Sequence, residues 1–211
     1  MLRSNVENWK RLQDQNYFEN HPCYKGLVDK GDSECELIES FMPISKNMKV
    51  VVIGCGYGRE SLHIAKRCNW VYGIDVSNII LGKARAYLAE NGISNFTPVL
   101  TENYATEIPN DIDLVFSIVV MQHITRDLAE DYFRILRRKL SPGGRLVVQF
   151  LEHLDTWGEK DAQLDDYEPS VSWTTAELAA LCERSGLHLE QVRTILATKT
   201  ALWHWLFAGP A

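Results

Sequence analysis

A buried strand followed by closely spaced glycines constrains the fold of this chain more than any other feature. Residues 50–53 form an apolar run suited to a strand that is buried on both faces, and Gly54, Gly56 and Gly58 follow it. Glycines at alternate positions allow a tight turn in which backbone atoms, rather than side chains, face a ligand. The pattern predicts a strand-loop-helix unit that binds a nucleoside.

An acidic residue, Asp75, ends the next predicted strand, residues 70–75, about 20 residues after the first glycine. A carboxylate at this point of such a unit accepts hydrogen bonds from ribose hydroxyls. The structural alternative for Asp75 is a helix cap for the turn that follows.

The glycine spacing separates two classes of cofactor. Dinucleotide sites carry G-x-G-x-x-G and place a pyrophosphate at a helix N-terminus, whereas this chain has G-x-G-x-G followed by Arg59 and Glu60. Glu60 in the first turn of a helix suits the helix dipole but repels a pyrophosphate placed there. A cofactor without phosphates therefore fits this loop better.

These residues resemble the motifs of the class I S-adenosylmethionine-dependent methyltransferases. Gly54-Cys55-Gly56-Tyr57-Gly58 is similar to the first motif of that family, and Asp75 is similar to the acid that ends its second strand. Residues 141–146 (SPGGRL) resemble the turn before its fifth strand, and residues 173–178 (WTTAEL) resemble the start of its last helix. The resemblance spans about residues 34–208 and implies S-adenosyl-L-methionine as the cofactor.

Apolar strands alternate with amphipathic helices from residue 49 to residue 150, which predicts a parallel sheet covered on both faces. The Ser141–Gly144 stretch is expected to end a helix over 127–140 and to start the fifth strand at Arg145. The expected fold is α/β, a Rossmann-like seven-stranded, mostly parallel sheet closed by an antiparallel C-terminal hairpin. Its strands are expected at 49–53, 70–75, 96–100, 113–120, 145–151, 187–194 and 198–208, and its other helices at 59–68, 78–91 and 176–185.

The first 33 residues lie outside the common core of the family. We expect residues 1–33 to form an N-terminal helical cap segment and residues 34–211 to form the methyltransferase domain. Aromatic residues of the segment, among them Tyr24, either cover the acceptor site or pack on the flank of the domain. Residues 152–172 are polar and acidic without periodicity, which indicates a long loop.

The resemblance also implies a set of cofactor contacts at the ends of the strands. The glycine loop faces the methionine part of the cofactor and Val76 packs on the adenine. Glu102 or Asn103 takes the adenine amino group, although most members carry Asp there and an ordinary surface acid is the alternative for Glu102. The expected cofactor-binding residues are Gly54, Cys55, Gly56, Gly58, Asp75, Val76, Glu102, Asn103 and Ser117.

Methyl transfer from a sulfonium is an in-line displacement, so positioning the acceptor supplies most of the catalysis. A hydroxyl acceptor benefits from a general base, whereas an amine needs only to be bound unprotonated. His123 is the candidate base, because imidazole titrates near neutral pH; a histidine hydrogen-bonded within its loop is the structural alternative. Tyr24, Glu152 and His153 are the candidate acceptor contacts, and a polar strand exit explains Glu152 and His153 equally well.

Composition limits the partners. The net charge of −6 argues against a large nucleic-acid footprint, which needs clustered Lys and Arg. No apolar run has the length of a membrane span or of a signal peptide, and five cysteines without a C-x-x-C pair favour a reduced, cytoplasmic protein with no metal site. The sequence does not indicate the oligomeric state.

Together these features predict an S-adenosylmethionine-dependent methyltransferase that acts on a small-molecule hydroxyl in sugar or secondary-metabolite biosynthesis. A small-molecule N-methyltransferase is the alternative. An NAD-dependent oxidoreductase and a non-catalytic cofactor-binding subunit are more remote alternatives for the function.

Overall fold

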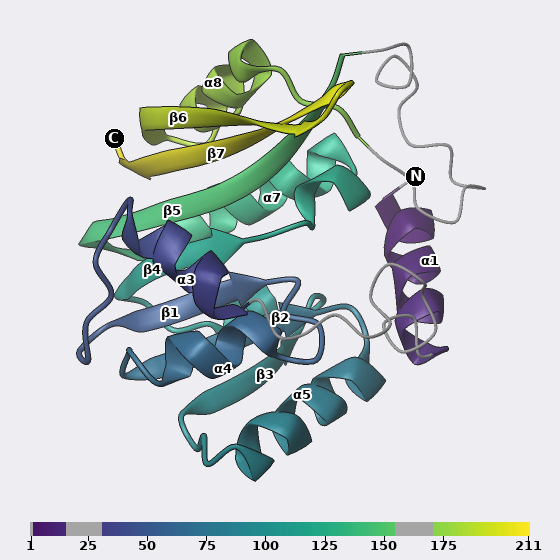
Figure 1. Ribbon diagram of the computed structural model, residues 1–211, viewed down its shortest axis with the longest axis vertical. Helices are drawn as coiled ribbons and strands as arrows, with labels where there is room; N and C mark the ends of the chain where they lie inside the picture. Colours follow the sequence, from purple (N-terminus) through teal and green to yellow (C-terminus); the bar gives the residue numbers. More distant parts are fainter. Residues whose placement is uncertain (1, 16–30, 155–170) are drawn as a thin grey trace. The chain divides into compact units, whose positions relative to one another are not determined.

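The computed structural model describes residues 2–15, 31–154 and 171–211 (Figure 1). The chain divides into two compact units, Val6–Pro109 and Asn110–Ala211, the second together with the first five residues. The expected division into a cap, residues 1–33, and a domain, residues 34–211, stays a prediction.

The N-terminal unit contains three parallel strands and the glycine loop. Val50 pairs with Val71, which in turn pairs with Phe96, so the middle strand of the three is β2. The strands are β1 (Lys49–Ile53), β2 (Trp70–Asp75) and β3 (Phe96–Leu100), and the helices are α1 (Leu2–Asp14), α3 (Gly31–Glu39), α4 (Arg59–Ala65), α5 (Asn78–Glu90) and α6 (Tyr104–Glu107). The three strands have the bounds expected from the sequence.

Burial on both faces explains why the first strand is apolar throughout. Val50, Val51, Val52 and Ile53 are all at most 2% exposed. Helix α4 buries Leu62 and Ile64, and α5 buries its apolar residues at helical spacing, Ile80, Ala84 and Leu88. The apolar run after residue 49 therefore forms the centre of this unit.

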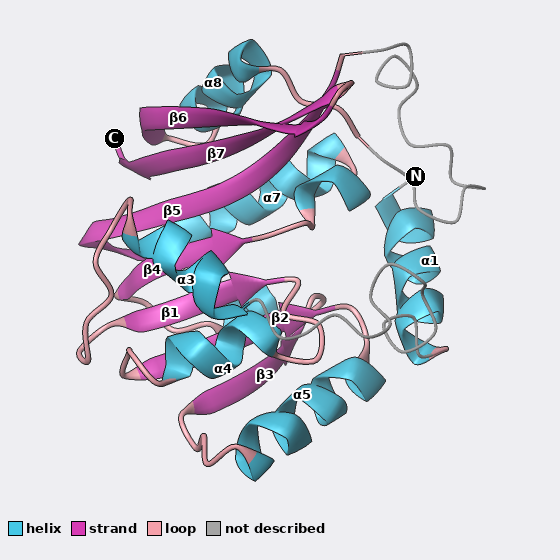
Figure 2. Ribbon diagram, viewed as in Figure 1, coloured by secondary structure: helices cyan, strands magenta, loops and turns pink. Residues whose placement is uncertain are grey.

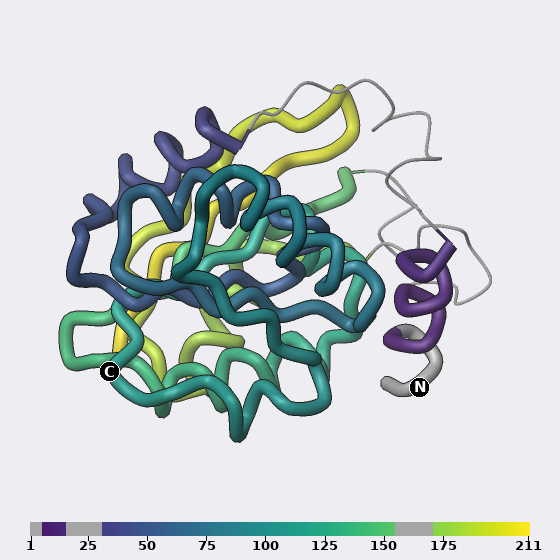
Figure 3. The backbone as a smooth tube through the Cα atoms, turned by 90° about the horizontal axis from the view of Figure 1, so that it is seen from below, coloured from purple at the N-terminus to yellow at the C-terminus, as the bar shows by residue number. Residues whose placement is uncertain are grey.

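The C-terminal unit contains four strands, of which the last two form a long antiparallel hairpin (Figure 3). Strand β4 pairs in parallel with β5, and β7 is antiparallel to both β5 and β6. The strands are β4 (Ile112–Ser117), β5 (Leu140–His153), β6 (Leu187–Thr198) and β7 (Ala201–Pro210), and the helices are the 3-10 turn η1 (Met121–His123), α7 (Arg126–Arg137) and α8 (Thr175–Arg184).

The strand order is β3-β2-β1-β4-β5-β7-β6, which is a mixed, seven-stranded sheet accompanied by helices (Figure 2). This order and the antiparallel hairpin confirm the expected Rossmann-like α/β class. No helix within residues 2–15, 31–154 and 171–211 has both the length and the apolar character that crossing a bilayer requires.

The expectation for the Ser141–Gly144 stretch was wrong. Helix α7 already ends at Arg137, and β5 begins at Leu140 and continues through the stretch. Ile112 pairs with Leu140 but Leu114 pairs with Arg145, so the intervening residues of β5 form a bulge instead of a break. Because β4 holds both ends of the bulge, proline and glycines are tolerated inside the strand.

The fourth strand is also shorter than expected. It ends at Ser117 rather than at residue 120, because Val119 adopts a left-handed backbone with φ 57°. A β-branched residue in this region is sterically unfavourable and cannot continue a strand.

The described cysteines are free, buried thiols. Burial raises the pKa of Cys35 and Cys68 to about 12 and that of Cys182 to about 11, and it raises the pKa of Cys55 as well. At neutral pH these thiols are protonated and behave as small apolar side chains.

Two adjacent glycines of the bulge give a matched pair of substitutions. A Cβ at Gly144 would collide with the carbonyl oxygen of Ile112, whereas a Cβ at Gly143 meets open space. We expect Gly144→Ala to lower the free energy of unfolding by about 2 kcal/mol, because the backbone has to shift, and Gly143→Ala to change it by less than about 0.5 kcal/mol. Urea unfolding followed by circular dichroism measures both. Equal effects of the two substitutions would contradict the bulge geometry.

Candidate functional site

The glycine loop joins β1 to α4 and has the conformation that its spacing predicts. Gly54, Gly56 and Gly58 have φ angles of 68°, 52° and 95°, in the left-handed region that favours glycine. The amide of Cys55 donates to the carbonyl of Ile74 over 2.9 Å, so the start of the loop is bonded to β2. Because three of the five loop residues have no Cβ, backbone atoms of the turn are free to face a ligand.

Asp75 binds the loop from the end of β2. Its Oδ2 accepts the amide of Gly56 at 2.9 Å, and its Oδ1 accepts the amide of Val76 at 2.8 Å. The residue is 6% exposed, and burial raises its pKa to about 6 against the opposing effect of the backbone amides. Each carboxylate oxygen has a second lone pair, so Asp75 can accept ligand hydroxyls while it holds the loop.

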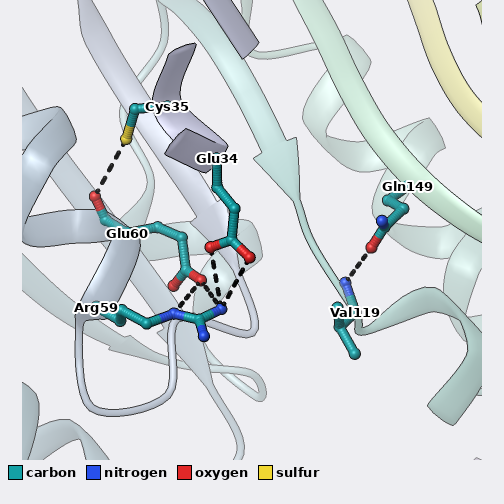
Figure 4. A network of polar contacts seen from close by, with 6 residues as sticks. All are labelled: Glu34, Cys35, Arg59, Glu60, Val119 and Gln149. Atoms are coloured by element: carbon teal, nitrogen blue, oxygen red, sulfur yellow. Dashed lines mark hydrogen bonds and ion pairs between the residues drawn. The ribbon is translucent and has the colours of Figure 1, made fainter. Parts of the chain in front are cut away.

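The start of α4 carries a group of charges that is negative in sum. Arg59 bonds to Glu60 and to Glu34 of α3, the latter at 3.0 Å, so one guanidinium faces two carboxylates (Figure 4). Asp75 adds a third carboxylate beside the same loop. This charge balance opposes a pyrophosphate and favours a cationic ligand such as a sulfonium.

The end of α1 is bonded to the turn after Asp75. Ser77 caps α5 by accepting the amides of Ile79 and Ile80, both at 3.2 Å, and its hydroxyl also bonds to the Asp14 carboxylate. Ser77 is fully buried, and Leu12 of α1 is 3% exposed. One turn of the N-terminal helix is therefore anchored two residues from Asp75.

The loop after β3 is hydrogen-bonded to the end of β2. The amide of Thr101 donates to the carbonyl of Asp75 at 2.9 Å, which bonds the predicted adenine loop to the backbone of the predicted ribose acid. Glu102 is exposed, and Asn103 precedes α6 as its N-cap. Every predicted cofactor residue except Ser117 therefore belongs to the N-terminal unit.

The C-terminal unit holds Ser117 and the candidate base. Ser117 is fully buried at the end of β4. After it, the strained Val119 donates its amide to Gln149 of β5 at 2.9 Å (Figure 4), and His123 is half-buried in η1. Backbone strain held by a specific hydrogen bond is typical of functional turns.

The end of β5 carries the two described acceptor candidates. His153 lines a cavity of about 470 Å³, and Glu152 bonds to His204 of β7 at 2.6 Å. Tyr24, the third candidate, lies outside the described residues. The cavity is bordered by Leu151, His153, Ala197, Thr198, Thr200, Ala201 and Trp203.

Sequence reasoning missed three polar residues that hold these sites, Asp14, Gln149 and His204. Gln149 is 5% exposed and His204 is 1% exposed, each inside an apolar strand. A polar residue within such a strand is the available signal, because a buried polar group needs a partner. Their partners are 30 and 52 residues away in the sequence and follow only from strand pairing.

Comparison with known proteins also indicates a methyltransferase domain. Residues 50–144 match a family model described as methyltransferase domain. The ubiquinone biosynthesis O-methyltransferase of Pseudomonas aeruginosa (strain LESB58) is 31% identical over 101 residues, which cover 47% of this chain and 43% of that protein. That of Aeromonas salmonicida (strain A449) is 29% identical and is covered to 42%. The chain thus spans less than half the length of the curated relatives it matches.

Solved structures share the fold at low sequence identity. Magnesium protoporphyrin IX methyltransferase from Synechocystis PCC 6803, with bound S-adenosylhomocysteine, aligns with a TM-score of 0.71 and 17% identity over 99% of this chain and all of that chain. The [4+2]-cyclase SpnF also aligns with a TM-score of 0.71, at 15% identity, over 85% of this chain and 81% of its own. Because a cyclase shares the fold, the reaction has to be argued from the site.

Replacement of Asp75 by Asn tests the carboxylate. An amide has a single acceptor oxygen, so its NH2 group would face the amide of either Gly56 or Val76. We expect Asp75→Asn to weaken S-adenosylhomocysteine binding by about 10- to 100-fold in calorimetry. Asp111→Asn, at an exposed position with φ 61°, is the control and should bind as the parent does.

The raised pKa of Asp75, about 6, predicts a pH dependence. The ionised carboxylate is the better acceptor for hydroxyls, so affinity for S-adenosylhomocysteine is full above the pKa and falls below it. We expect about tenfold weaker binding at pH 5 than at pH 7.5, because one pH unit below the pKa leaves about a tenth of the carboxylate ionised. Binding of the Asn variant should not show this change. A flat profile for the parent would contradict the assignment.

Proposed function

We propose that this chain, whose residues 50–144 form a class I S-adenosylmethionine-dependent methyltransferase domain, methylates a hydroxyl of a small molecule. The observation that carries the donor half of this proposal is the Asp75 carboxylate, which holds the amides of Gly56 and Val76 and keeps lone pairs for ribose hydroxyls. The excess of carboxylates beside the loop suits the positive charge of a sulfonium.

In our proposal, different residues of this chain bind different parts of the methyl donor. The amides of the glycine loop bind the methionine part, Asp75 binds the ribose, and Val76 packs on the adenine. Glu102 or Asn103 takes the adenine amino group, and Ser117 contacts the methionine part. When bound, S-adenosylmethionine would supply an electrophilic methyl group for in-line transfer to the acceptor oxygen, with S-adenosylhomocysteine as the leaving group.

A hydroxyl acceptor is supported by the relatives, which are named O-methyltransferases. His123 takes the proton of that hydroxyl, because it lies on the turn held after β4. The wall of the cavity at the end of β5, with Leu151, Ala201 and Trp203, favours an acceptor that carries a ring. Among acceptors, this lining supports an aromatic secondary metabolite better than a sugar.

Three other functions make different predictions. A small-molecule N-methyltransferase would not depend on a base at His123, because an amine can be bound unprotonated. A non-catalytic subunit would bind S-adenosylhomocysteine but methylate acceptors only together with a partner. An NAD-dependent oxidoreductase would bind NADH more tightly than S-adenosylhomocysteine.

Replacement of His123 by Ala tests the hydroxyl reaction. We expect the variant to lose about 100- to 10,000-fold in turnover with hydroxyl acceptors and to keep its affinity for S-adenosylhomocysteine. Transfer of labelled methyl groups to an acceptor panel measures the first quantity, and calorimetry measures the second. Replacement of the exposed His188 by Ala is the control. His188 lies on the edge strand β6, whereas η1 follows β4, which is three places further along the strand order. Unchanged turnover of His123→Ala would exclude this base.

A further inference from the structure

The first turn of α4 carries a carboxylate, Glu60, that is bonded at one oxygen only. Its Oε1 accepts Nε of Arg59 at 2.8 Å and also Nη2 of the same guanidinium (Figure 4). Its Oε2 has no hydrogen-bond or ion-pair partner within the part of the chain that the structure describes, although the residue is only 9% exposed. Because both oxygens of an ionised carboxylate accept hydrogen bonds, this buried side chain has unused capacity.

The unbonded oxygen of Glu60 can be reached from outside. Some unbonded side-chain oxygens of this unit, such as those of Gln13 and Ser61, are fully enclosed by protein, but Oε2 of Glu60 is not enclosed in this way. Glu60 is therefore a largely buried side chain with one accessible acceptor atom. Such an atom is available to a ligand.

Glu60 lies beside the glycine loop. It follows Gly58, the last glycine of the loop, by two residues. Burial is the main cause of the raised pKa of the Cys55 thiol in this loop, and the negative charges of Asp75 and Glu60 raise that pKa further. Since Coulomb interactions weaken with distance, both carboxylates are close to the loop.

Helix α3 holds the Glu60 carboxylate in place. Arg59, which binds Oε1 of Glu60, is itself bound by Glu34 of α3, with 3.0 Å between Nη2 of Arg59 and Oε2 of Glu34. The thiol of Cys35, the next residue of α3, donates to the carbonyl of Glu60 over 3.8 Å. The free oxygen is thus preorganised, because its side chain and main chain are both bonded before a ligand arrives.

The charge around Glu60 indicates which kind of ligand group would bind there. One guanidinium faces the carboxylates of Glu34 and Glu60, so one negative charge is in excess. A buried charge that is not balanced is costly, and a cation that also donates a hydrogen bond would offset this cost. An ammonium group meets both requirements, whereas a sulfonium has no N–H and a carboxylate would be repelled.

We propose that Oε2 of Glu60 binds the α-ammonium group of the methionine part of the donor and makes the site selective for ligands that carry this amine. The inference rests on the proposed function, in which the glycine loop binds the methionine part. Glu60 contacts the cofactor, whereas Arg59 and Glu34 are positioning residues that act through it.

The test uses two ligands that differ by one amine, S-adenosylhomocysteine and its deamino analogue 4-(5′-adenosylthio)butanoate. We expect calorimetry to show about 10- to 100-fold tighter binding of S-adenosylhomocysteine to the parent, the range for a hydrogen bond between charged groups. Glu60→Gln keeps an oxygen for Arg59 but loses the charge, so it should bind the two ligands with about equal affinity. Glu36→Gln, at an exposed position of α3, is the matched control and should keep the preference of the parent.

A third ligand distinguishes amine recognition from a general role of Glu60 in the fold. 5′-Methylthioadenosine lacks the whole amino-acid end, so the parent and Glu60→Gln should bind it equally well. Glu34→Gln leaves the Glu60 carboxylate in place but removes a partner of Arg59. This variant should reduce the preference for the amine by about two- to fivefold, since ion pairs near the surface are weak, and it should leave methylthioadenosine binding unchanged.

The outcomes separate this inference from the proposed function. A parent that binds S-adenosylhomocysteine without preference for the amine, or a preference that Glu60→Gln retains, overturns the assignment of Glu60 and leaves the donor site standing. Weaker binding of methylthioadenosine to Glu60→Gln than to the parent would assign Glu60 a role in the shape of the loop and overturn amine recognition. Failure of the parent to bind S-adenosylhomocysteine would refute the proposed function itself.

Discussion

The two hydrogen bonds of the Asp75 carboxylate hold the N-terminal unit in the shape that a cofactor site needs. One oxygen binds the amide of Gly56 in the loop after β1, and the other binds the amide of Val76 after β2. The carbonyl of the same residue accepts the amide of Thr101 after β3. A single residue therefore connects the ends of three parallel strands, and the left-handed glycines allow the loop to meet it.

This arrangement costs stability. Burial raises the pKa of Asp75 from 3.8 to about 6, so the folded state binds its proton more tightly than the unfolded state does. The contribution of Asp75 to stability is thus largest below about pH 4 and decreases as the pH rises through 6. Near neutral pH the protein keeps an ionised carboxylate that its own fold disfavours, which is typical of a group retained for binding.

The sequence predicted the elements whose causes are local. The apolar run of β1 and the glycine spacing lead directly to a buried strand and a left-handed turn, and α5 begins at Asn78 as expected. It failed at the Ser141–Gly144 stretch, where pairing with Ile112 and Leu114 overrides a strong local breaker signal. It also could not find Gln149 or His204, because a polar residue in a strand reveals that it has a partner but not which one. Strand register supplies that information, and register is a property of distant segments.

The polar contacts of the two units differ in kind. In the N-terminal unit the Asp75 carboxylate accepts backbone amides of the glycine loop and of the next residue, and the position of the loop amide follows from the glycine pattern. In the C-terminal unit the polar contacts run through side chains, with Gln149 on Val119 and His204 on Glu152. Side-chain contacts of this kind can differ between chains that share one fold. Buried His204 illustrates this difference, because its two ring nitrogens are bonded to side chains of two neighbouring strands, Glu152 of β5 and Thr194 of β6, and only the strand register brings these residues together.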